Sequence, residues 1–390
     1  MDRLIARTVR QNVPLSVHFD LTYRCNERCV HCYLDHEDHG ELLTSECLEI
    51  LEQLASSGAL FLTLSGGEIF LRKDLEEILA CARRLHFDVS LKTNALLLTH
   101  ARAEKLARLG VRRVQVSVYS SDPAVHDAVT KVPGSLARTL AAIPFLLEQG
   151  INVKLACPLM KENLLAYRGV MALAEGLGVA YVLDMTITPM MDGSQGPILH
   201  RVGAEALLPV LQDAALQGCH PPAKKQEDLP ALLGSATSSG MESDAYDDLP
   251  CSAGHNSCYI SPYGDVYACV QLPIPAGNLR RRRFDEIWRG SSALKQVRAM
   301  RESELPVCSR CDIRKYCERC PGLAWMEGGD LLGAYERACE LAEQKARLAG
   351  VARPQSAWHA QCAANETKNS SAKGRVYDSM EMTNEGTRHD

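Results

Sequence analysis

The chain has 390 residues, of which 46% are hydrophobic and 23% charged, and its formal net charge is −5. This composition is typical of a globular protein of two or three domains, and the weak negative charge argues against nucleic acid as a partner. The sequence has neither a signal-peptide core nor an apolar run long enough to cross a bilayer, so we expect a cytoplasmic protein with no membrane partner.

Short β-rich runs alternate with amphipathic stretches of helical length after an N-terminal extension, residues 1–14. This alternation predicts parallel β-α units and an α/β fold. The predicted strands are 15–21, 60–64, 88–92, 113–118, 152–156 and 181–185. Thr44 is predicted to cap a helix that Gly58 ends, and Asn163 to cap one that runs to about Gly178. Six such units form either an open doubly wound sheet or an incomplete barrel, and periodicity does not separate the two.

Three closely spaced cysteines, Cys25, Cys29 and Cys32, follow the first predicted strand, with His31 before the third. Three thiolates can hold an iron-sulfur cluster that keeps one iron open to an outside ligand, whereas a fourth would close the site. Zinc is the alternative, although zinc ligands usually come as two pairs. The chain has sixteen cysteines, and a reducing compartment favours metal or cluster binding over disulfides. We interpret five scattered cysteines as incidental: Cys47, Cys81, Cys157, Cys219 and Cys362.

Gly66, Gly67 and Glu68 follow the second predicted strand. Two glycines allow the backbone to approach a ligand closely, and the glutamate offers an acceptor, although such a run is usually a plain turn. The ends of parallel strands meet at one edge of a sheet, so this run and the cysteine triplet are predicted to lie together.

Later strand ends carry weaker candidates, for which ordinary strand-end hydrogen bonding is an equal alternative. These are Thr93, Asn94, Ser117 and the more ambiguous Lys154. His36 and His39 are interpreted as part of a polar loop rather than as metal ligands.

The C-terminal third contains a second group of cysteines, which follows a polar stretch, residues 221–250, predicted to be a linker or mobile loop. Eight thiols suffice for two closed four-thiolate clusters, and one four-cysteine zinc site is the alternative. The eight are Cys251, Cys258, Cys269, Cys308, Cys311, Cys317, Cys320 and Cys339. A basic run, residues 280–283, is interpreted as a solvated turn and helix start that could attract an acidic peptide. Residues 351–390 are predicted to be a disordered tail.

The Cys-x3-Cys-x2-Cys triplet resembles the signature of the radical S-adenosylmethionine (SAM) enzymes, and residues 66–68 resemble the motif of that family that binds the amino group of SAM. The resemblance implies a partial (β/α)6 TIM-like barrel over residues 15–220, with SAM on the open iron of a 4Fe-4S cluster at the triplet. It also implies a reductive cleavage that yields a 5'-deoxyadenosyl radical. Thr93, Asn94 and Ser117 would then contact the ribose and carboxylate of SAM.

The later cysteines resemble the SPASM domain of radical SAM enzymes, here residues 251–350, a small α+β domain with two auxiliary 4Fe-4S clusters. The resemblance assigns the first cluster to Cys251, Cys258, Cys269 and Cys320, and the second to Cys308, Cys311, Cys317 and Cys339. Two departures stand out. In the family pattern three residues separate the last two cysteines of the central run, whereas two residues separate Cys317 from Cys320. The second departure concerns the aspartate that anaerobic sulfatase-maturating enzymes are thought to use as a base, because that position is Val270 here. The catalytic base is therefore not identified, and sulfatase maturation is disfavoured.

The resemblance favours an enzyme that modifies a ribosomally made peptide or protein by crosslinking, epimerisation or oxidation, with three clusters in all. It implies an electron donor such as flavodoxin or ferredoxin and, because residues 1–14 are too few for a leader-binding domain, a separate recognition protein or direct binding of the peptide. Two alternatives stay open: a radical SAM enzyme of heme or heme d1 biosynthesis, and a non-catalytic iron-sulfur or zinc protein.

Overall fold

The computed structural model describes residues 2–213, 216, 248–352 and 356, and the chain divides into two compact units, residues 1–301 and 302–390. Almost all of the predicted linker and tail therefore lies outside the described residues. None of the helices in the described part is long and apolar enough to cross a membrane.

Nine strands of the first unit form one sheet within the described residues, in the order β6-β5-β4-β3-β2-β1-β7-β8-β9. The pairs from β6 through β1 to β7 are parallel, and β7-β8-β9 is antiparallel. The strands are β1 Ser16–Thr22, β2 Phe61–Gly66, β3 Asp88–Thr93, β4 Arg113–Ser117, β5 Asn152–Pro158, β6 Ala180–Asp184, β7 Ser257–Ile260, β8 Asp265–Cys269 and β9 Leu272–Asn278. All six predicted strands are present, with ends shifted by at most two residues.

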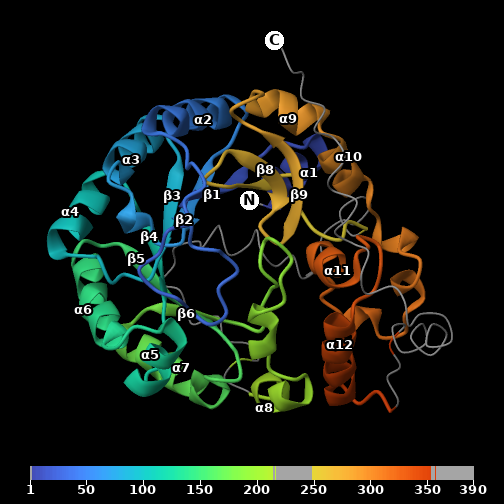
Figure 1. Cartoon of the computed structure of the whole chain (residues 1–390). Helices are drawn as coiled ribbons and strands as arrows, with labels where there is room; N and C mark the ends of the chain where they lie inside the picture. The colour runs from blue at the N-terminus through green and yellow to red at the C-terminus, as the bar shows by residue number, and fades with distance from the viewer. Residues whose placement is uncertain (1, 214–215, 217–247, 353–355, 357–390) are drawn as a thin grey trace, which may run out of the picture. The chain divides into compact units, whose positions relative to one another are not determined.

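Strand order decides between the two architectures that the sequence left open. The first six strands neighbour one another in chain order, whereas a doubly wound sheet reverses direction at a switch point. Figure 1 shows their helices along the outer side of the curved sheet, as in a barrel. The helices of this unit are α1 Asp2–Gln11, α2 Thr44–Ser56, α3 Leu75–Arg84, α4 His100–Arg108, α5 Pro123–Thr130, α6 Ser135–Glu148, α7 Tyr167–Leu177, α8 Leu208–Leu211, α9 Phe284–Gly290 and α10 Ser292–Ala299. The partial barrel is confirmed.

Side chains alternate between the two faces of the sheet as the strand period requires. Val17, Phe19 and Leu21 of β1 are at most 1% exposed and belong to the core under the helices. His18 and Asp20 therefore point to the concave, inner face. Polar residues on that face are unusual, because the interior of a TIM barrel is normally filled by branched apolar side chains. We infer that the inner face is a binding surface.

Two predicted helix caps differ from the structure. α2 begins at Thr44, but its entry is held by Glu46, whose Oε2 accepts the Leu43 backbone N–H at 2.7 Å, while the Thr44 hydroxyl bonds Asp74. Asn163 precedes a short 3-10 helix, Leu164–Ala166, and uses its amide to bond the carbonyls of Tyr119 and Pro158. In both cases a distant partner competes for the side chain that local sequence would place at the cap.

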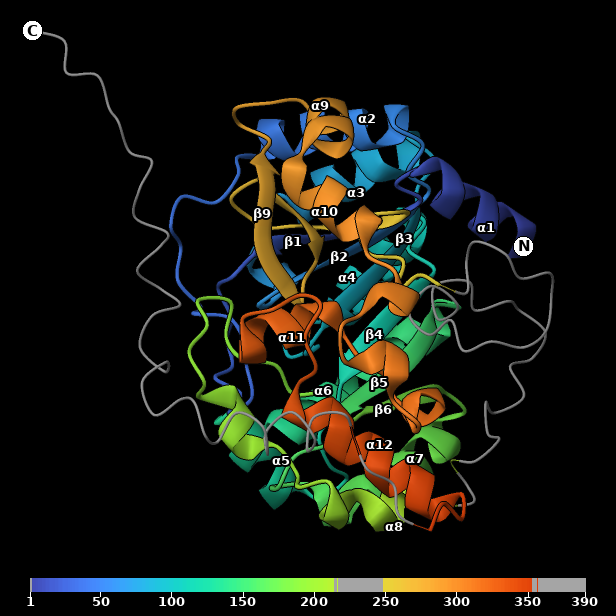
Figure 2. The same ribbon diagram turned by 90° about the vertical axis from the view of Figure 1, so that its right-hand side faces the viewer.

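The predicted SPASM segment is divided between the two units. Its first part, β7 to α10, packs with the barrel, because β7 pairs with β1 and continues the sheet. Figure 2 shows α10 beside β9. The second unit contains α11 Pro321–Gly328, α12 Glu336–Leu348 and short 3-10 turns at Glu302–Glu304, Cys308–Arg310 and Arg314–Tyr316.

Candidate functional site

The cysteine triplet lies on the loop from residue 24 to residue 43, which leaves the C-terminal end of β1 and enters α2; we call it the cluster loop. Its first half is hydrogen-bonded to the end of α5. The backbone N–H of Arg28 donates to the carbonyl of Thr130, and that of Val30 donates to the carbonyl of Val129, both at 3.0 Å. The loop thus holds its cysteines at the strand-end edge of the sheet, where barrel enzymes place their active sites.

The three thiols lie close enough to influence one another electrostatically. Burial raises the pKa of Cys25 to about 12 and that of Cys32 to about 11, and it also raises the pKa of Cys29. In the metal-free protein these thiols are therefore protonated at neutral pH, and binding of a cluster must release their protons.

Cys25, Cys29 and Cys32 are the residues that would hold an iron-sulfur cluster with one open iron. Among the described residues, no three His, Cys, Asp or Glu side chains converge on a point that could hold one ion. Buried polar atoms without a partner, Glu27 Oε1 and His31 Nδ1, also lie within this loop.

Sequence reasoning missed three residues that surround the triplet. Glu27 is 3% exposed, its Oε2 lies 3.4 Å from the sulfur of Cys29, and burial raises the pKa of its carboxyl to about 7. The hydroxyl of Tyr119 lies 3.5 Å from the same sulfur. His36, interpreted as part of a polar loop, has Nε2 3.0 Å from the sulfur of Cys32. In the sequence, the only indication of a role for Glu27 is its position between two predicted cluster ligands, Cys25 and Cys29.

The two glycines of residues 66–68 are needed for contact with the protein's own backbone. A Cβ on Gly66 would lie 2.1 Å from the Thr22 carbonyl oxygen, and one on Gly67 would lie 2.4 Å from that of Arg24. Gly66 also has a φ of 141°, which favours glycine. The end of β2 therefore touches the start of the cluster loop, and Gly67 N–H donates to the Thr22 carbonyl at 2.8 Å.

Glu68 is completely buried beside the glycines. Its carboxylate accepts the hydroxyl of Thr93 at 2.8 Å and the backbone N–H groups of Phe70 and Asn94 at 3.0 and 2.9 Å. Burial raises the pKa of the carboxyl, and these donors oppose the rise. The Asn94 amide also donates to Asn26 at 2.7 Å. Thr93 and Asn94, predicted to contact SAM, thus join Glu68 to the cluster loop.

Of the predicted residues that remain, Ser117 is a hydrogen-bond partner of the Tyr119 side chain, whose hydroxyl lies beside the sulfur of Cys29. Ser117 is at the C-terminal end of β4, and Lys154 lies one strand further on, with Gln115 opposite it in register. His39 pairs with Asp35 on the exposed part of the cluster loop at 2.8 Å.

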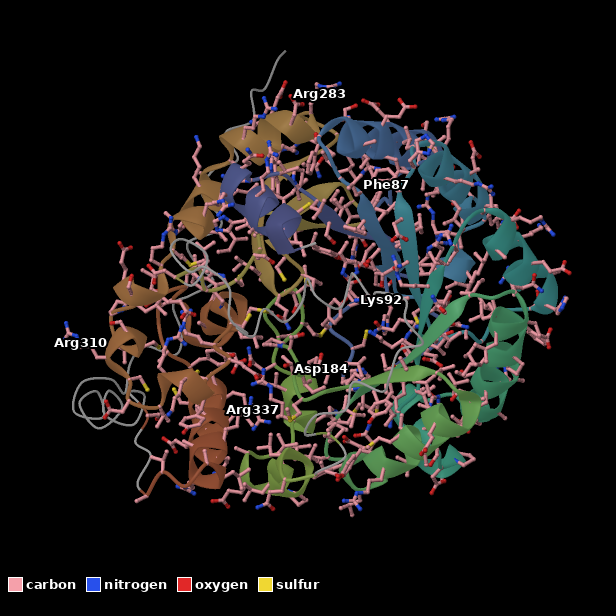
Figure 3. All side chains as sticks on the ribbon, turned by 180° about the vertical axis from the view of Figure 1, so that it is seen from behind. Phe87, Lys92, Asp184, Arg283, Arg310 and Arg337 are labelled. Carbon is pink, nitrogen blue, oxygen red and sulfur yellow. The ribbon has the colours of Figure 1, made fainter. Side chains whose placement is uncertain are left out.

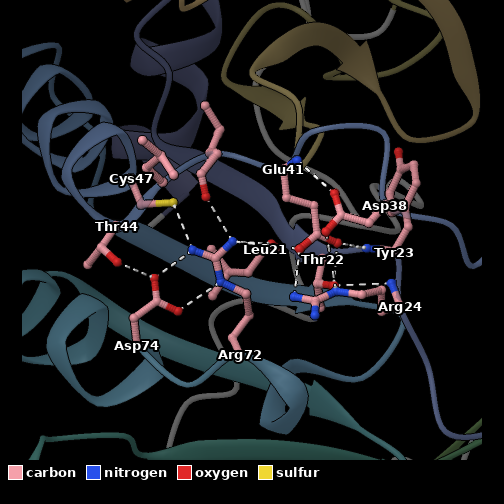
Figure 4. Close-up of polar contacts among 12 residues, drawn as sticks. Leu21, Thr22, Tyr23, Arg24, Asp38, Glu41, Thr44, Cys47, Arg72 and Asp74 are labelled. Atoms are coloured by element: carbon pink, nitrogen blue, oxygen red, sulfur yellow. Dashed lines mark hydrogen bonds and ion pairs between the residues drawn. The ribbon is translucent and has the colours of Figure 1, made fainter.

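A buried ion-pair network fixes the exit of the cluster loop (Figure 4). The guanidinium of Arg72 donates to both carboxylate oxygens of Asp74, at 2.9 and 2.6 Å, and to the carbonyls of Leu21 and Leu42. Glu41, also buried, accepts from Arg24 at 2.9 Å and from the Tyr23 backbone N–H. Residues 41–42 are therefore bound to the end of β1.

The inner face of the barrel carries a second polar group. Asp20 accepts from Tyr259 at 2.8 Å and lies 3.1 Å from His18 Nε2. Lys92 and Asp184 point toward the interior from β3 and β6 (Figure 3). Desolvation lowers the pKa of Lys92, and the charges of Asp20 and Asp184 oppose this. Lys154 of β5 lies on the same face, as do Asp88 of β3 and Arg113 of β4, which form an ion pair at 2.6 Å.

The ligands predicted for the first auxiliary cluster point in different directions. Tyr259 pairs with Tyr267, so Cys258 lies opposite Ala268 and faces α10, where Arg298 is a neighbour. Cys269 is on the other face, toward Lys92 and Tyr33. The order of cysteines along the chain does not record strand alternation, and these two thiols lie on opposite faces of the sheet. That Cys258 and Cys269 bind the same cluster stays a prediction. Cys251 is exposed before β7, and Cys320 belongs to the second unit.

The second unit brings together the ligands predicted for the second auxiliary cluster. Cys308 and Cys339 pack in one apolar cluster, and Cys311 and Cys317 pack against another. Cys308, Cys311 and Cys317 also influence one another electrostatically. Arg319 is 8% exposed, its charge acts on Cys308, and its Nη1 has no partner. Arg319 also acts on Cys320, and a buried donor beside two thiols fits an anionic cluster.

Comparison with known proteins agrees with this geometry. Residues 19–172 match the model of the radical SAM superfamily, and residues 251–312 match that of SPASM, an iron-sulfur cluster-binding domain. The chain is 30% identical over 335 residues to the AdoMet-dependent heme synthase of Methanosarcina barkeri, which covers 82% of this chain and 95% of that protein. It is 27% identical to the mycofactocin maturase MftC of Mycobacterium ulcerans, over 78% of this chain and 82% of the relative.

Solved structures show the same fold. SuiB of Streptococcus suis bound to S-adenosylmethionine superimposes with a TM-score of 0.63 at 17% identity, covering 87% of this chain and 78% of that one. The anSMEcpe structure with bound AdoMet and a Cp18Cys peptide has a TM-score of 0.64 at 14% identity, covering 86% and 97%.

Proposed function

The chain belongs to the radical SAM superfamily and carries a SPASM domain, and from this premise we propose that it modifies a ribosomally made peptide or protein. Cys25, Cys29 and Cys32 would hold a cluster able to supply the electron for reductive cleavage of SAM, and the C-terminal cysteines would hold an auxiliary cluster able to accept the electron released when a substrate radical is oxidised. The residues of the chain orient the reactants: Glu68, Thr93 and Asn94 order the strand ends beside the triplet, and the barrel excludes water.

The relatives name two chemistries, heme synthesis and peptide maturation. The observation that favours the peptide is the charge of the inner face. Asp20 and Asp184 lie there with Lys92 and Lys154, and the same strand alternation adds Asp88 and Arg113, which pair with each other, so neither sign of charge is in excess among these six. Porphyrins of heme biosynthesis carry several carboxylates, for which an excess of cations would be expected. A peptide segment with few charges matches a balanced polar surface.

The test is to incubate the anaerobically reconstituted enzyme with SAM, reduced flavodoxin and the short peptide encoded beside it. Crosslinking or oxidation removes two hydrogen atoms from the peptide, and epimerisation carried out in D2O introduces a deuterium, so mass spectrometry detects either. We expect the change only when 5'-deoxyadenosine is also formed. A peptide that leaves the reaction unchanged while deoxyadenosine accumulates would overturn the proposal for that peptide.

Heme synthesis is the second candidate, because the relative at 30% identity is matched over 95% of its length. A parallel reaction with an iron porphyrin separates the two. Porphyrin-dependent formation of 5'-deoxyadenosine, with the porphyrin consumed, would replace the peptide with a tetrapyrrole as the substrate.

A further inference from the structure

The second half of the cluster loop, residues 33–43, is held mainly at residues 40–42, just before α2; we call these residues the exit of the loop. Arg72 reaches the exit from the barrel, as described above. A second arginine, Arg280, reaches it from the polypeptide that follows β9, almost 240 residues away in sequence. The two arginines approach the same three residues, 40–42, from different parts of the first unit.

Arg280 makes two contacts with the exit and two with the first turn of α2. Its Nε and Nη2 lie 2.7 and 3.0 Å from the two carboxylate oxygens of Glu46, in a bidentate pair. Its Nη1 donates to the carbonyl of Gly40 at 2.9 Å, and Nη2 donates to that of Glu41 at 3.1 Å. The hydrogen bond from Arg280 lowers the pKa of Glu46. The guanidinium therefore links the loop backbone to the first turn of α2.

The β7–β8 turn holds the same segment. The Leu42 N–H donates to the carbonyl of Pro262 at 2.7 Å, and the hydroxyl of Tyr263 donates to the carbonyl of Glu37 at 3.0 Å. Tyr263 also packs edge-on against Tyr23, two residues before Cys25, with ring centroids 5.3 Å apart. The hairpin that leads from Cys251 toward Cys269 thus forms one wall of the cluster loop.

The neighbours of Arg280 in the basic run make weaker contacts. Arg282 bonds the Glu286 carbonyl within its own turn, and Arg283 lies 3.5 Å from Asp285 on an exposed surface. Only Arg280, among residues 280–283, has contacts with the cluster loop in the described structure. Positive charge alone therefore does not explain the contacts of Arg280 with the cluster loop, because Arg282 and Arg283 carry the same charge and contact only residues of their own segment.

We propose that Arg280 is a positioning residue for the SAM site: it fixes the exit of the cluster loop to the SPASM hairpin, and so preorganises the triplet for SAM. A loop that is ordered before binding loses less entropy when the ligand arrives, so loss of Arg280 weakens SAM binding more than it slows the cleavage step. This inference rests on the SAM chemistry of the family and not on the choice of a peptide as substrate.

The experiment compares Arg280→Ala with Arg281→Ala, which removes an equal charge from the neighbouring exposed position. Hydrogen exchange of residues 33–43 in the metal-free protein needs neither cofactor nor peptide, so a failure of the peptide proposal leaves it intact. SAM affinity is read from the change in the EPR spectrum of the reduced reconstituted protein, and SAM KM from cleavage without peptide. We expect faster exchange and an increase in KM of about tenfold in Arg280→Ala, corresponding to ~1.4 kcal/mol.

Arg281→Ala should match the wild type, and Arg280→Lys should fall between, because an ammonium keeps the charge but loses the bidentate geometry. Iron content and Tm should be unchanged in all three. Equal exchange and equal KM in the two alanine variants would overturn the proposal. A fall in Tm and iron content of Arg280→Ala, with exchange increased throughout the barrel, would overturn it too, because Arg280 would then be part of general stability.

Discussion

Substitution of Gly67 by alanine should disturb the start of the cluster loop. A Cβ at this position would lie 2.4 Å from the Arg24 carbonyl oxygen and 2.5 Å from that of Tyr23. Carbon and oxygen normally approach to about 3.3–3.6 Å, so the two backbones must separate by roughly 1 Å. Both obstructing groups are backbone and cannot rotate away.

The energetic cost follows from this separation. Overpacking of a tight site costs about 1–3 kcal/mol. The hydrogen bonds from Gly67 N–H to Thr22 and from Glu68 N–H to Arg24 also lengthen, at about 1 kcal/mol each. We expect a loss of about 3–5 kcal/mol, which lowers Tm by roughly 6–20 °C at about 2–4 °C per kcal/mol.

Gly176→Ala is the matched control. Gly176 is exposed in α7, and a Cβ there meets no atom within 4 Å. Alanine in a helix is favoured over glycine by about 0.8–1 kcal/mol, so this variant should have an unchanged or higher Tm. Differential scanning calorimetry of both variants checks the sign, and SAM cleavage should fall only in Gly67→Ala. Equal Tm values and equal cleavage in the two variants would refute the close contact.

Three further outcomes are expected. Cys258→Ala should retain the iron of the wild-type protein, whereas Cys308→Ala should lose part of it, as measured by iron and sulfide analysis; equal losses would make Cys258 a ligand. Arg72→Ala should lower Tm by several degrees, because removal of one partner of a buried pair leaves Asp74 uncompensated, and an unchanged Tm would contradict the network. Burial lowers the pKa of His126 and His255 to about 4. Since the unfolded chain binds these protons near pH 6.5, stability is complete above that pH and falls by about 1.4 kcal/mol per pH unit for each histidine down to pH 4; a flat Tm over this window would contradict their burial.

Much of the fold follows from local pattern. Alternation in β1 places Val17, Phe19 and Leu21 under the helices, and parallel strands bring the triplet and residues 66–68 to one edge of the sheet. These features depend on short-range periodicity and on the geometry of parallel strands, both of which a sequence displays.

The rest depends on contacts between distant segments. Arg280 and Glu46 are 234 residues apart, and nothing in either neighbourhood indicates the pair. The same holds for Tyr119 beside Cys29, and for Asp74, which draws Thr44 away from a capping role. Spacing between cysteines also does not record which face of a strand each one occupies, so the sequence could not show that Cys258 and Cys269 lie on opposite faces of the sheet.

The most direct test of the central claim is single replacement of Cys25, Cys29 and Cys32 by alanine, with 5'-deoxyadenosine and the auxiliary-cluster spectra measured on the same samples. If the triplet is the site of radical initiation, none of the three variants forms deoxyadenosine. The spectra of the auxiliary clusters bound by the C-terminal cysteines should persist in each variant. Deoxyadenosine formed at the wild-type rate by any of the three variants would contradict the assignment.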